Sequence, residues 1–273
     1  MKQYLEALKY VYENGKDRKD RTGVGTRSVF GMQIRYDLSQ GFPIVTTKKV
    51  NFNSIVAELL WFISGSSDNN ELNKLGTHIW DANAEADYWK PKAKFPGDLG
   101  RVYGVQWRSW NAPDGRTIDQ LAEAIRKIKE DPFDRRIIVS AWNPGELDQM
   151  ALPPCHIMFQ FYVDNDRLSL QMYQRSCDMF LGVPFNISSY ALLTHMVAQV
   201  TNLKAGEFIH VMGDTHIYQN HFSQVEEQLK RKPHPLPVLK LNPKINDINK
   251  FTKDDIELID YKHDSALKAP MAV

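Results

Sequence analysis

Residues 150–161 most constrain the fold of this chain, because two consecutive prolines stand directly before a cysteine and a run of apolar residues. Proline fixes φ and lacks an amide donor, so Pro153 and Pro154 exclude a helix at this point. The short apolar and aromatic run after Cys155 predicts a buried strand. The sequence therefore predicts a thiol at the entrance of a core strand, either as a nucleophile or as a small buried hydrophobe.

Helical and strand patterns mix along the chain without a repeat, a low-complexity segment or an interdomain linker. Apolar spacing and stop signals predict helices over residues 4–12, 53–64 and 182–200, one from a capping box at Thr117 to about Lys129, and one that ends near Lys230. Strands are predicted over residues 28–36, 137–142, 156–161, 168–173, 208–212 and 255–261. Residues 82–96 have no period and predict a long surface loop, and residues 98–108 have strand-like neighbours around a tyrosine. Together these patterns predict one α+β domain over residues 1–273.

Charge and cysteine content narrow the class of protein further. Lys and Arg number 34 against 33 Asp and Glu, so no net field attracts nucleic acid or a membrane, and an anionic partner needs a local cluster of cations. The N-terminus is an amphipathic helix start, and no apolar run approaches the roughly 18 residues that span a bilayer. Two cysteines in 273 residues make no disulfide framework, which predicts free thiols and a cytoplasmic location.

Cys155 could belong to a Cys-His hydrolase, a redox pair or a metal site, and the sequence disfavours each of these. Neighbours on a strand point to opposite faces, so His156 is a poor base for Cys155. His216 remains a possible base, but no companion Asn or Asp pattern accompanies it. No Cys-x-x-Cys motif is present, Cys177 lies on another element, and no His and Cys spacing matches a tetrahedral metal site. The remaining hypothesis is a thiolate activated by positive charge.

Four arginines, Arg21, Arg135, Arg136 and Arg175, are candidates for that charge. Arginine binds phosphate through its planar fork, and a nearby cation lowers a thiol pKa. Arg21 lies in the charged, glycine-bearing run 16–26, which is either a solvated loop or a phosphate-binding loop. These residues together suggest a phosphorylated substrate with an electrophilic carbon.

Two further polar residues stand in apolar surroundings. Glu58 lies in the apolar helix 53–64, where it is either buried with a raised pKa, suited to proton transfer, or placed on the one wet stripe. Asn186 lies near the predicted start of a helix and carries both a donor and an acceptor, which could read an imide edge. Its position alone favours an N-cap role instead.

The motifs in their joint order resemble the thymidylate synthase family, and the resemblance covers residues 21–273. The motifs are Arg21-Thr22-Gly23-Val24-Gly25-Thr26, Glu58-Leu59-Leu60-Trp61-Phe62, Ile79-Trp80-Asp81, Tyr103-Gly104-Val105-Gln106-Trp107-Arg108, Arg135-Arg136-Ile137, Pro154-Cys155-His156, Gln174-Arg175-Ser176-Cys177-Asp178, residues 181–186, residues 213–218 and residues 268–273.

The resemblance implies a mixed β-sheet flanked by helices, with a homodimer formed through the sheet. It also implies a methyltransferase that converts dUMP and 5,10-methylenetetrahydrofolate to dTMP and dihydrofolate, without a metal or a nicotinamide. The Cys155 thiolate would add to C6 of the uracil, so that C5 becomes the carbon nucleophile.

Roles for individual residues follow from the same resemblance. Arg21, Arg175 and Ser176 would hold the 5′-phosphate, joined by Arg135 and Arg136 from the second subunit. Asn186 would read uracil O4 and N3–H, and His216 and Tyr218 would hold the ribose 3′-OH. Glu58, with His156 nearby, would organise waters that move protons, and Tyr103 would assist removal of the C5 proton. The folate would meet Trp80, Asp178, Gly182, Lys49 and the carboxylate of Val273, whereas Cys177 has no assigned chemistry and is interpreted as core.

Three positions depart from the family pattern. Asn51 stands where histidine is common, which affects contacts to the folate tail. Arg101 stands where proline is usual and would add a cation close to the nucleotide site. The loop 83–97 falls where family lengths vary, and its Tyr88-Trp89-Lys90 inherits no role.

Two alternatives remain beside the synthase hypothesis. A pyrimidine-nucleotide hydroxymethylase of the same superfamily would use water in place of the hydride. Asn186 argues against a cytosine substrate for such an enzyme, and the tail 268–273 argues for a lid that excludes water. An RNA-binding regulator, including an mRNA-binding one, is disfavoured by the near-neutral charge and by the presence of Cys155.

Overall fold

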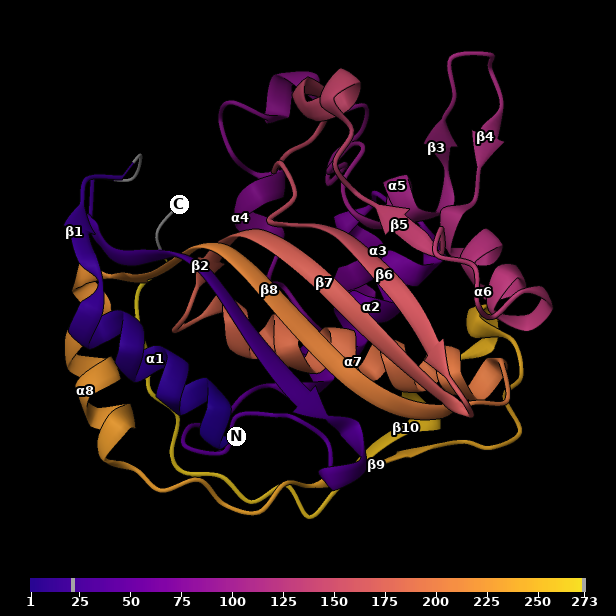
Figure 1. Ribbon diagram of the computed structural model, residues 1–273. Helices are drawn as coiled ribbons and strands as arrows, with labels where there is room; N and C mark the ends of the chain where they lie inside the picture. Colours follow the sequence, from indigo (N-terminus) through magenta and orange to yellow (C-terminus); the bar gives the residue numbers. More distant parts are fainter. Residues whose placement is uncertain (21–22, 272–273) are drawn as a thin grey trace.

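The computed structural model describes residues 1–20 and 23–271, and its centre is a six-stranded mixed sheet with the order β1-β2-β8-β7-β6-β5 (Figure 1). The strands of this sheet are β1 (Lys16–Arg18), β2 (Thr26–Asp37), β5 (Ile138–Ser140), β6 (His156–Asp164), β7 (Arg167–Asp178) and β8 (Lys204–Tyr218). Neighbouring strands are antiparallel except β7 and β8, which are parallel. The mixed α+β domain that the sequence predicted is therefore present.

Helices and small hairpins surround the sheet. The α-helices are α1 (Lys2–Asn14), α2 (Phe52–Ser64), α3 (Asn69–Lys74), α4 (Asp81–Ala84), α5 (Gly104–Arg108), α6 (Gln120–Glu130), α7 (Gly182–Val200) and α8 (Phe222–Lys230). The two-stranded sheets pair β3 (Trp110–Asn111) with β4 (Thr117–Ile118) and β9 (Val238–Leu241) with β10 (Ile256–Ile259). The short 3-10 turns are η1 (Leu38–Gln40), η2 (Lys90–Lys92), η3 (Pro144–Gln149), η4 (Gln219–His221), η5 (Ile248–Lys250) and η6 (Lys253–Asp255). None of the helices in the described ranges is long and apolar enough to cross a bilayer.

Helix α7 forms the crossover between the two parallel strands, and it lies against one face of the sheet (Figure 1). A parallel pair needs such a crossover because its strands cannot be joined by a tight turn. The helix is apolar on nearly every side, and its buried residues include Val183, Ile187, Leu193 and Met196. It is thus a core helix between the sheet and α2, and no helix of the described residues lies on the opposite face of β6, β7 and β8 (Figure 1).

Helix α2 carries the predicted apolar pattern and has well-formed ends. The side chain of Asn51 accepts a hydrogen bond from the Ser54 amide at 3.3 Å, which caps the N-terminus. Gly65 ends the helix with φ 74°, a left-handed conformation that glycine adopts without strain. The predicted helix 53–64 is confirmed to within one residue, and Asn51 acts in this structure as its cap.

Several sequence-based boundaries are wrong for identifiable reasons. Residues 104–108 form the short helix α5 instead of continuing a strand. The predicted cap at Thr117 is wrong, since Thr117 lies in β4 and the side chain of Asp119 caps α6 by accepting from the Ala122 amide at 2.9 Å. The loop 82–96 contains the short helical turns α4 and η2, and Trp89 within it is buried.

Strand β8, with 15 residues, is three times as long as the predicted strand 208–212. Its second half begins at Gly213, whose sequence neighbourhood resembles a turn. A Cβ at Gly213 would lie 3.0 Å from the carbonyl oxygen of Arg175, so glycine allows the close approach of β7 here. Because β2 and β7 flank β8 on both sides, the strand continues to Tyr218 and brings His216 opposite Asp178.

Candidate active site

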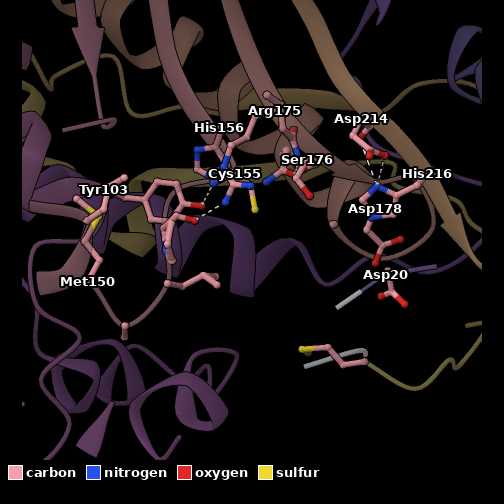
Figure 2. Close-up of a pocket in the computed structure, with 18 of the residues that line it drawn as sticks. Asp20, Tyr103, Met150, Cys155, His156, Arg175, Ser176, Asp178, Asp214 and His216 are labelled. Carbon is pink, nitrogen blue, oxygen red and sulfur yellow. Dashed lines mark hydrogen bonds and ion pairs between the residues drawn. The ribbon is translucent and has the colours of Figure 1, made fainter. Parts of the chain in front are cut away.

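A cavity of about 910 Å³ opens where the ends of β7 and β8 meet the start of β6 and α7 (Figure 2). The sequence-predicted residues that line it are Glu58, Trp80, Tyr103, Cys155, His156, Arg175, Ser176, Asp178, Gly182, Asn186, His216 and Tyr218. The cavity walls also include Arg18, Lys19, Asp20, Tyr88, Trp89, Lys92, Met150, Gln174, Asp214 and Met271. Side chains from most of the chain therefore converge on one space.

Cys155 directly precedes β6, and its backbone is held on both sides. The amide of Cys155 donates to Tyr103 Oη at 2.8 Å, and its carbonyl accepts from the Arg175 amide at 2.8 Å. The Arg175 guanidinium donates from Nε to the Pro154 carbonyl at 2.9 Å and from Nη2 to the Pro153 carbonyl at 3.0 Å. Figure 2 shows Cys155 between Tyr103 and Ser176. Arg175 thus fixes the proline segment that places the thiol.

The net pKa shift of the Cys155 thiol is opposite to the one expected from the sequence. Burial raises the pKa of Cys155, and the positive charge of Arg175 with contacts to Tyr103 and Ser176 offsets only part of this rise. The prediction of a thiol pKa lowered by arginine is therefore correct for the direction of Arg175 and wrong for the net shift. The physical reason is that the cavity wall withdraws the sulfur from water, which penalises the thiolate.

His156 does not act on Cys155 in this geometry. Its Nδ1 lies 2.7 Å from the Tyr190 hydroxyl, and its ring stacks on Tyr103 with centroids 4.2 Å apart. Burial, with a smaller contribution from His210, lowers the pKa of His156 to about 3, so the ring is neutral near neutral pH. The argument from strand geometry that excluded His156 as the base agrees with these contacts.

Glu58 faces the cavity from α2 and accepts a hydrogen bond on Oε1 from Trp80 Nε1 at 2.7 Å. Burial raises the pKa of Glu58 to about 7, and the Trp80 hydrogen bond opposes that rise. The side chain is also partly exposed to the cavity, so the buried and the wet alternative each hold in part. A carboxyl group with this pKa exchanges protons readily near neutral pH.

Tyr103 is held in a strained backbone conformation at the start of α5, with φ 23° and ψ −88°. Its ring packs between Phe62, at 5.0 Å between centroids, and His156. Non-glycine residues with positive φ persist only where packing enforces them, and they concentrate at functional sites. The strain here places the hydroxyl of Tyr103 on the amide of Cys155.

Asn186 lies inside α7, four residues beyond the first helical residue Gly182, so the N-cap alternative is wrong. Gln174 Nε2 donates to Asn186 Oδ1 at 3.0 Å, and Gln174 Oε1 pairs with His210 Nε2 at 2.9 Å. These bonds fix the orientation of the Asn186 amide. Sequence reasoning missed Gln174, although a glutamine in a strand with apolar alternation was a signal for a buried polar contact.

The opposite wall carries His216, Asp214 and Asp178 (Figure 2). His216 Nδ1 lies 3.1 Å from Asp214 Oδ1, which orients the imidazole ring. Asp178 Oδ1 accepts from the amides of Phe180 and Leu181 at 2.9 and 3.1 Å. Both side chains are therefore held in place by local hydrogen bonds, a property that positioned ligand contacts need.

Some predicted site residues lie outside this cavity. Lys49 is exposed and does not line it, whereas the adjacent Lys48 is buried and donates through Nζ to the Phe180 carbonyl. Burial lowers the pKa of Lys48 to about 8, with nearby Asp178 opposing the shift. Packing determines that Lys48, and not Lys49, points into the protein, and no local sequence pattern predicted this choice.

The remaining arginines and the chain end are placed differently. Arg135 and Arg136 are exposed beside β5 and outside the cavity, and Arg136 Nε pairs with Asp134 Oδ1 at 2.8 Å. Arg21 and Val273 lie outside the described residues. The roles assigned to these four residues therefore remain predictions.

Arg101 does not add a cation to the cavity, contrary to expectation. It donates through Nε to Glu146 Oε2 at 2.8 Å and through Nη2 to the Ser109 carbonyl at 2.6 Å. Glu146 also accepts from Gln106 Nε2 and Asn111 Nδ2, each at 2.7 Å. The side chain turns away because this acidic partner, remote in sequence, lies behind the cavity wall.

The loop 83–97 supplies part of the wall, which sequence reasoning missed. Tyr88, Trp89 and Lys92 line the cavity, and Tyr88 Oη donates to the Ala151 carbonyl at 2.8 Å. Two adjacent aromatic residues in an otherwise polar loop were the available signal. Among the described residues, His, Cys, Asp and Glu form no group of three or more that could hold a metal ion.

A family model described as thymidylate synthase matches residues 2–273, which is nearly the whole chain.

Proposed function

The chain belongs to the thymidylate synthase family, and we propose that it methylates dUMP to dTMP with 5,10-methylenetetrahydrofolate as co-substrate. The family uses this folate as its carbon source. The observation that carries the proposal is the convergence of Cys155, Glu58, Tyr103 and Asn186 on a single cavity. This set offers a nucleophile, an acid–base group near neutral pKa, a hydroxyl and an amide reader of the base.

The nucleotide would bind with its phosphate at Arg175 and Ser176. Arg175 donates from Nε and Nη2 to the proline carbonyls, so Nη1 and the positive charge of the guanidinium can still bind an anion. Arg21 would add a second fork from the loop before β2. His216, oriented by Asp214, and Tyr218 would hold the ribose hydroxyl.

Base recognition would depend on Asn186. Because Gln174 donates to Asn186 Oδ1, the amide presents a fixed pattern to the cavity, with Nδ2 as donor and a second lone pair on Oδ1 as acceptor. That pattern complements O4 and N3–H of uracil. A cytosine edge, with an amino donor and an unprotonated N3, would match it poorly.

The chemistry would begin with loss of the thiol proton to water in the cavity and addition of the Cys155 sulfur to C6 of the base, which moves the C5–C6 π electrons toward C5 and O4. Burial raises the free energy of the Cys155 thiolate, so the thiolate is a strong nucleophile once it has formed. The charge of Arg175 offsets part of this cost of ionising the thiol. Glu58, with a pKa of about 7, would supply or take a proton at O4 through water. Tyr103, held next to Cys155, would position a water for removal of the C5 proton.

The folate would provide the one-carbon unit and the hydride when bound. Trp80 presents an indole whose N–H is already engaged by Glu58, and Asp178 and Gly182 lie on the same cavity. A flat pterin suits such an aromatic wall with a carboxylate beside it. Lys49 and the Val273 carboxylate would meet the tail and close the cavity.

A homodimer would complete the site. On β6, Phe161 and Val163 are buried, so by strand alternation Tyr162, which is 66% exposed, lies on the other face of the sheet. Isolated proteins rarely leave such residues on a bare sheet. Packing two copies through this face would carry the exposed Arg135 and Arg136 of one toward the cavity of the other. Two free cysteines suit a cytoplasmic location.

The decisive assay combines tritium release from 5-tritiated dUMP with product identification. The proposal expects release only with methylenetetrahydrofolate, and dTMP as the product. Formation of 5-hydroxymethyl-dUMP would establish a hydroxymethylase instead. Cys155→Ser should lose nearly all turnover and keep nucleotide binding, because Arg175 and Asn186 remain; equal loss of binding would make Cys155 structural.

A further inference from the structure

The segment that carries the nucleophile contains no helix or strand between the last residue of η3 and the first residue of β6. Residues 149–155, here called the cysteine loop, run from the end of η3 to the start of β6. Pro153 and Pro154 contribute no amide donors to it. Its position is therefore set by hydrogen bonds that reach it from other parts of the chain.

Two groups of contacts hold the cysteine loop. At its C-terminal end, Tyr103 and Arg175 bind Cys155 and the proline carbonyls, as described above. At its N-terminal end, the Ala151 amide donates to the Leu99 carbonyl at 3.0 Å, and the Arg101 amide donates to the Gln149 carbonyl at 2.8 Å. These backbone bonds leave the Ala151 carbonyl to a side chain, and that side chain is Tyr88.

The segment around Tyr88 is a rigid support. Trp89 is buried, and its Nε1 donates to the Asp98 carbonyl at 2.6 Å. A Cβ at Gly100 would lie 2.1 Å from the Gln149 carbonyl oxygen and 2.6 Å from the Trp89 ring, so these three groups are in close contact. Tyr88 therefore extends from a fixed base next to the cysteine loop.

The Tyr88 ring itself is 60% exposed, yet its hydroxyl donates to the Ala151 carbonyl at 2.8 Å. Burial of the ring does not account for this arrangement, because the side chain gains little packing from it. We propose that Tyr88 is a positioning residue: its hydroxyl fixes the cysteine loop, and the segment 83–97 acts as a brace for the nucleophile.

The brace would act through the backbone. Tyr88 binds the loop four residues before Cys155, and its hydroxyl restrains the Ala151 carbonyl while Leu99 restrains the Ala151 amide. Loosening this restraint would admit water to the thiol and relieve the burial that raises its pKa. Asn186 is held by Gln174, and Arg175 meets the loop two and three residues beyond Ala151, at the proline carbonyls, so nucleotide binding should change little.

The test is Tyr88→Phe, which removes only the hydroxyl, compared with Tyr10→Phe on the surface of α1, where the tyrosine is 53% exposed and outside the cavity. We expect kcat to fall about 3- to 10-fold, the range that a net hydrogen bond supports, with the KM for dUMP within about twofold of wild type. Iodoacetamide should alkylate Cys155 at least about three times faster. Cys177 is fully buried, and Cys155→Ser provides the blank.

The turnover part of this inference depends on the proposed function, whereas the alkylation part does not. If Tyr88→Phe is alkylated faster but the wild-type protein releases no tritium, the proposed function is wrong and the role of Tyr88 as a brace stands. Alkylation and kcat equal to those of Tyr10→Phe would overturn the brace. A raised KM with unchanged alkylation would also overturn it, because Tyr88 would then be only a ligand contact.

Discussion

Glu58 and Glu146 are two shielded carboxylates whose pKa values shift in opposite directions. Burial raises the pKa of Glu58 to about 7 against the one hydrogen bond, from Trp80, found for it within the described ranges. Burial also pushes the pKa of Glu146 upward, but hydrogen bonds from Gln106, Arg101 and Asn111 outweigh it and leave the pKa below 4.5. Hydrogen-bond donors thus decide the direction of the pKa shift of Glu146, whereas burial decides that of Glu58.

This difference separates a reactive region, the cavity wall at Glu58 and Cys155, from a structural region, the hydrogen-bonded cluster of Arg101 and Glu146. A buried carboxylate that is fully hydrogen-bonded and paired with a cation is costly to protonate, so Glu146 serves as a fixed anion. Glu58 is incompletely compensated and exchanges its proton near neutral pH, which carries an energetic penalty for folding. Three substitutions at or beside these carboxylates test this contrast.

Glu146→Ala should destabilise the protein by about 3–5 kcal/mol, because it leaves a buried guanidinium without its counterion. The Arg101 side chain is only 14% exposed, so water cannot replace the carboxylate well. Denaturant unfolding at fixed protein concentration measures the loss. Glu6→Ala, in an exposed pair with Lys2, is the control and should change stability by less than about 0.5 kcal/mol. A loss below about 1 kcal/mol for Glu146→Ala would show that the network is not structural.

Glu58→Gln should stabilise the protein above pH 7 while it reduces turnover. The folded pKa of about 7 exceeds the usual 4.5, so wild-type stability declines as pH rises between these values and then levels. Glutamine has no charge to desolvate, and the gain should reach on the order of 2 kcal/mol after allowance for partial solvent access.

Unfolding measured at several pH values between about 4.5 and 8 checks this gain, which should vanish at the acidic end. Glu146→Gln is the matched control. Its carboxylate has a lowered folded pKa, so the stability it contributes is present above about 4.5 and is lost as pH falls through the folded value. The control should therefore be destabilised at neutral pH. The same sign for both variants would refute the comparison.

Trp80→Phe should give the smallest effect, a further rise of about one unit in the pKa of Glu58. The substitution keeps an aromatic wall and removes the single Nε1 donor that now opposes burial. Isotope-edited NMR titration of the glutamate carboxyl groups follows the shift, and Glu58→Gln identifies the signal. An unchanged or lower pKa would mean that the indole does not compensate the charge.

Local sequence patterns predicted the strand that follows Cys155 and the helix that carries Glu58, and left the use of each side chain open. The prolines before Cys155 and the apolar helix around Glu58 encode their own geometry within a few residues. The structural region was not predictable in this way, because Arg101 and Glu146 come from separate segments that only the fold brings together. For the same reason the family departure at Arg101 was assigned to the nucleotide site.

The lengths of helices and strands were likewise predictable only where local residues determine them. Core helices such as α7 were predicted well because their apolar pattern is continuous. The extension of β8 through Gly213 was missed, since hydrogen bonding to β2 and β7 maintains the strand where the local residues favour a turn. The aromatic wall at Tyr88 was also missed, because its hydroxyl finds its partner on a remote loop.

The pairing of β2 with β8 has a consequence for how the protein is made. Thr26 lies opposite Tyr218, so a strand synthesised early waits for one synthesised late. Such high contact order slows folding and leaves β2 without one of its sheet neighbours while the ribosome is still translating. The N-terminal wall of the cavity, which follows from this pairing, can close only after about four-fifths of the chain has emerged. Nascent chains are therefore expected to need protection from aggregation until β8 is complete.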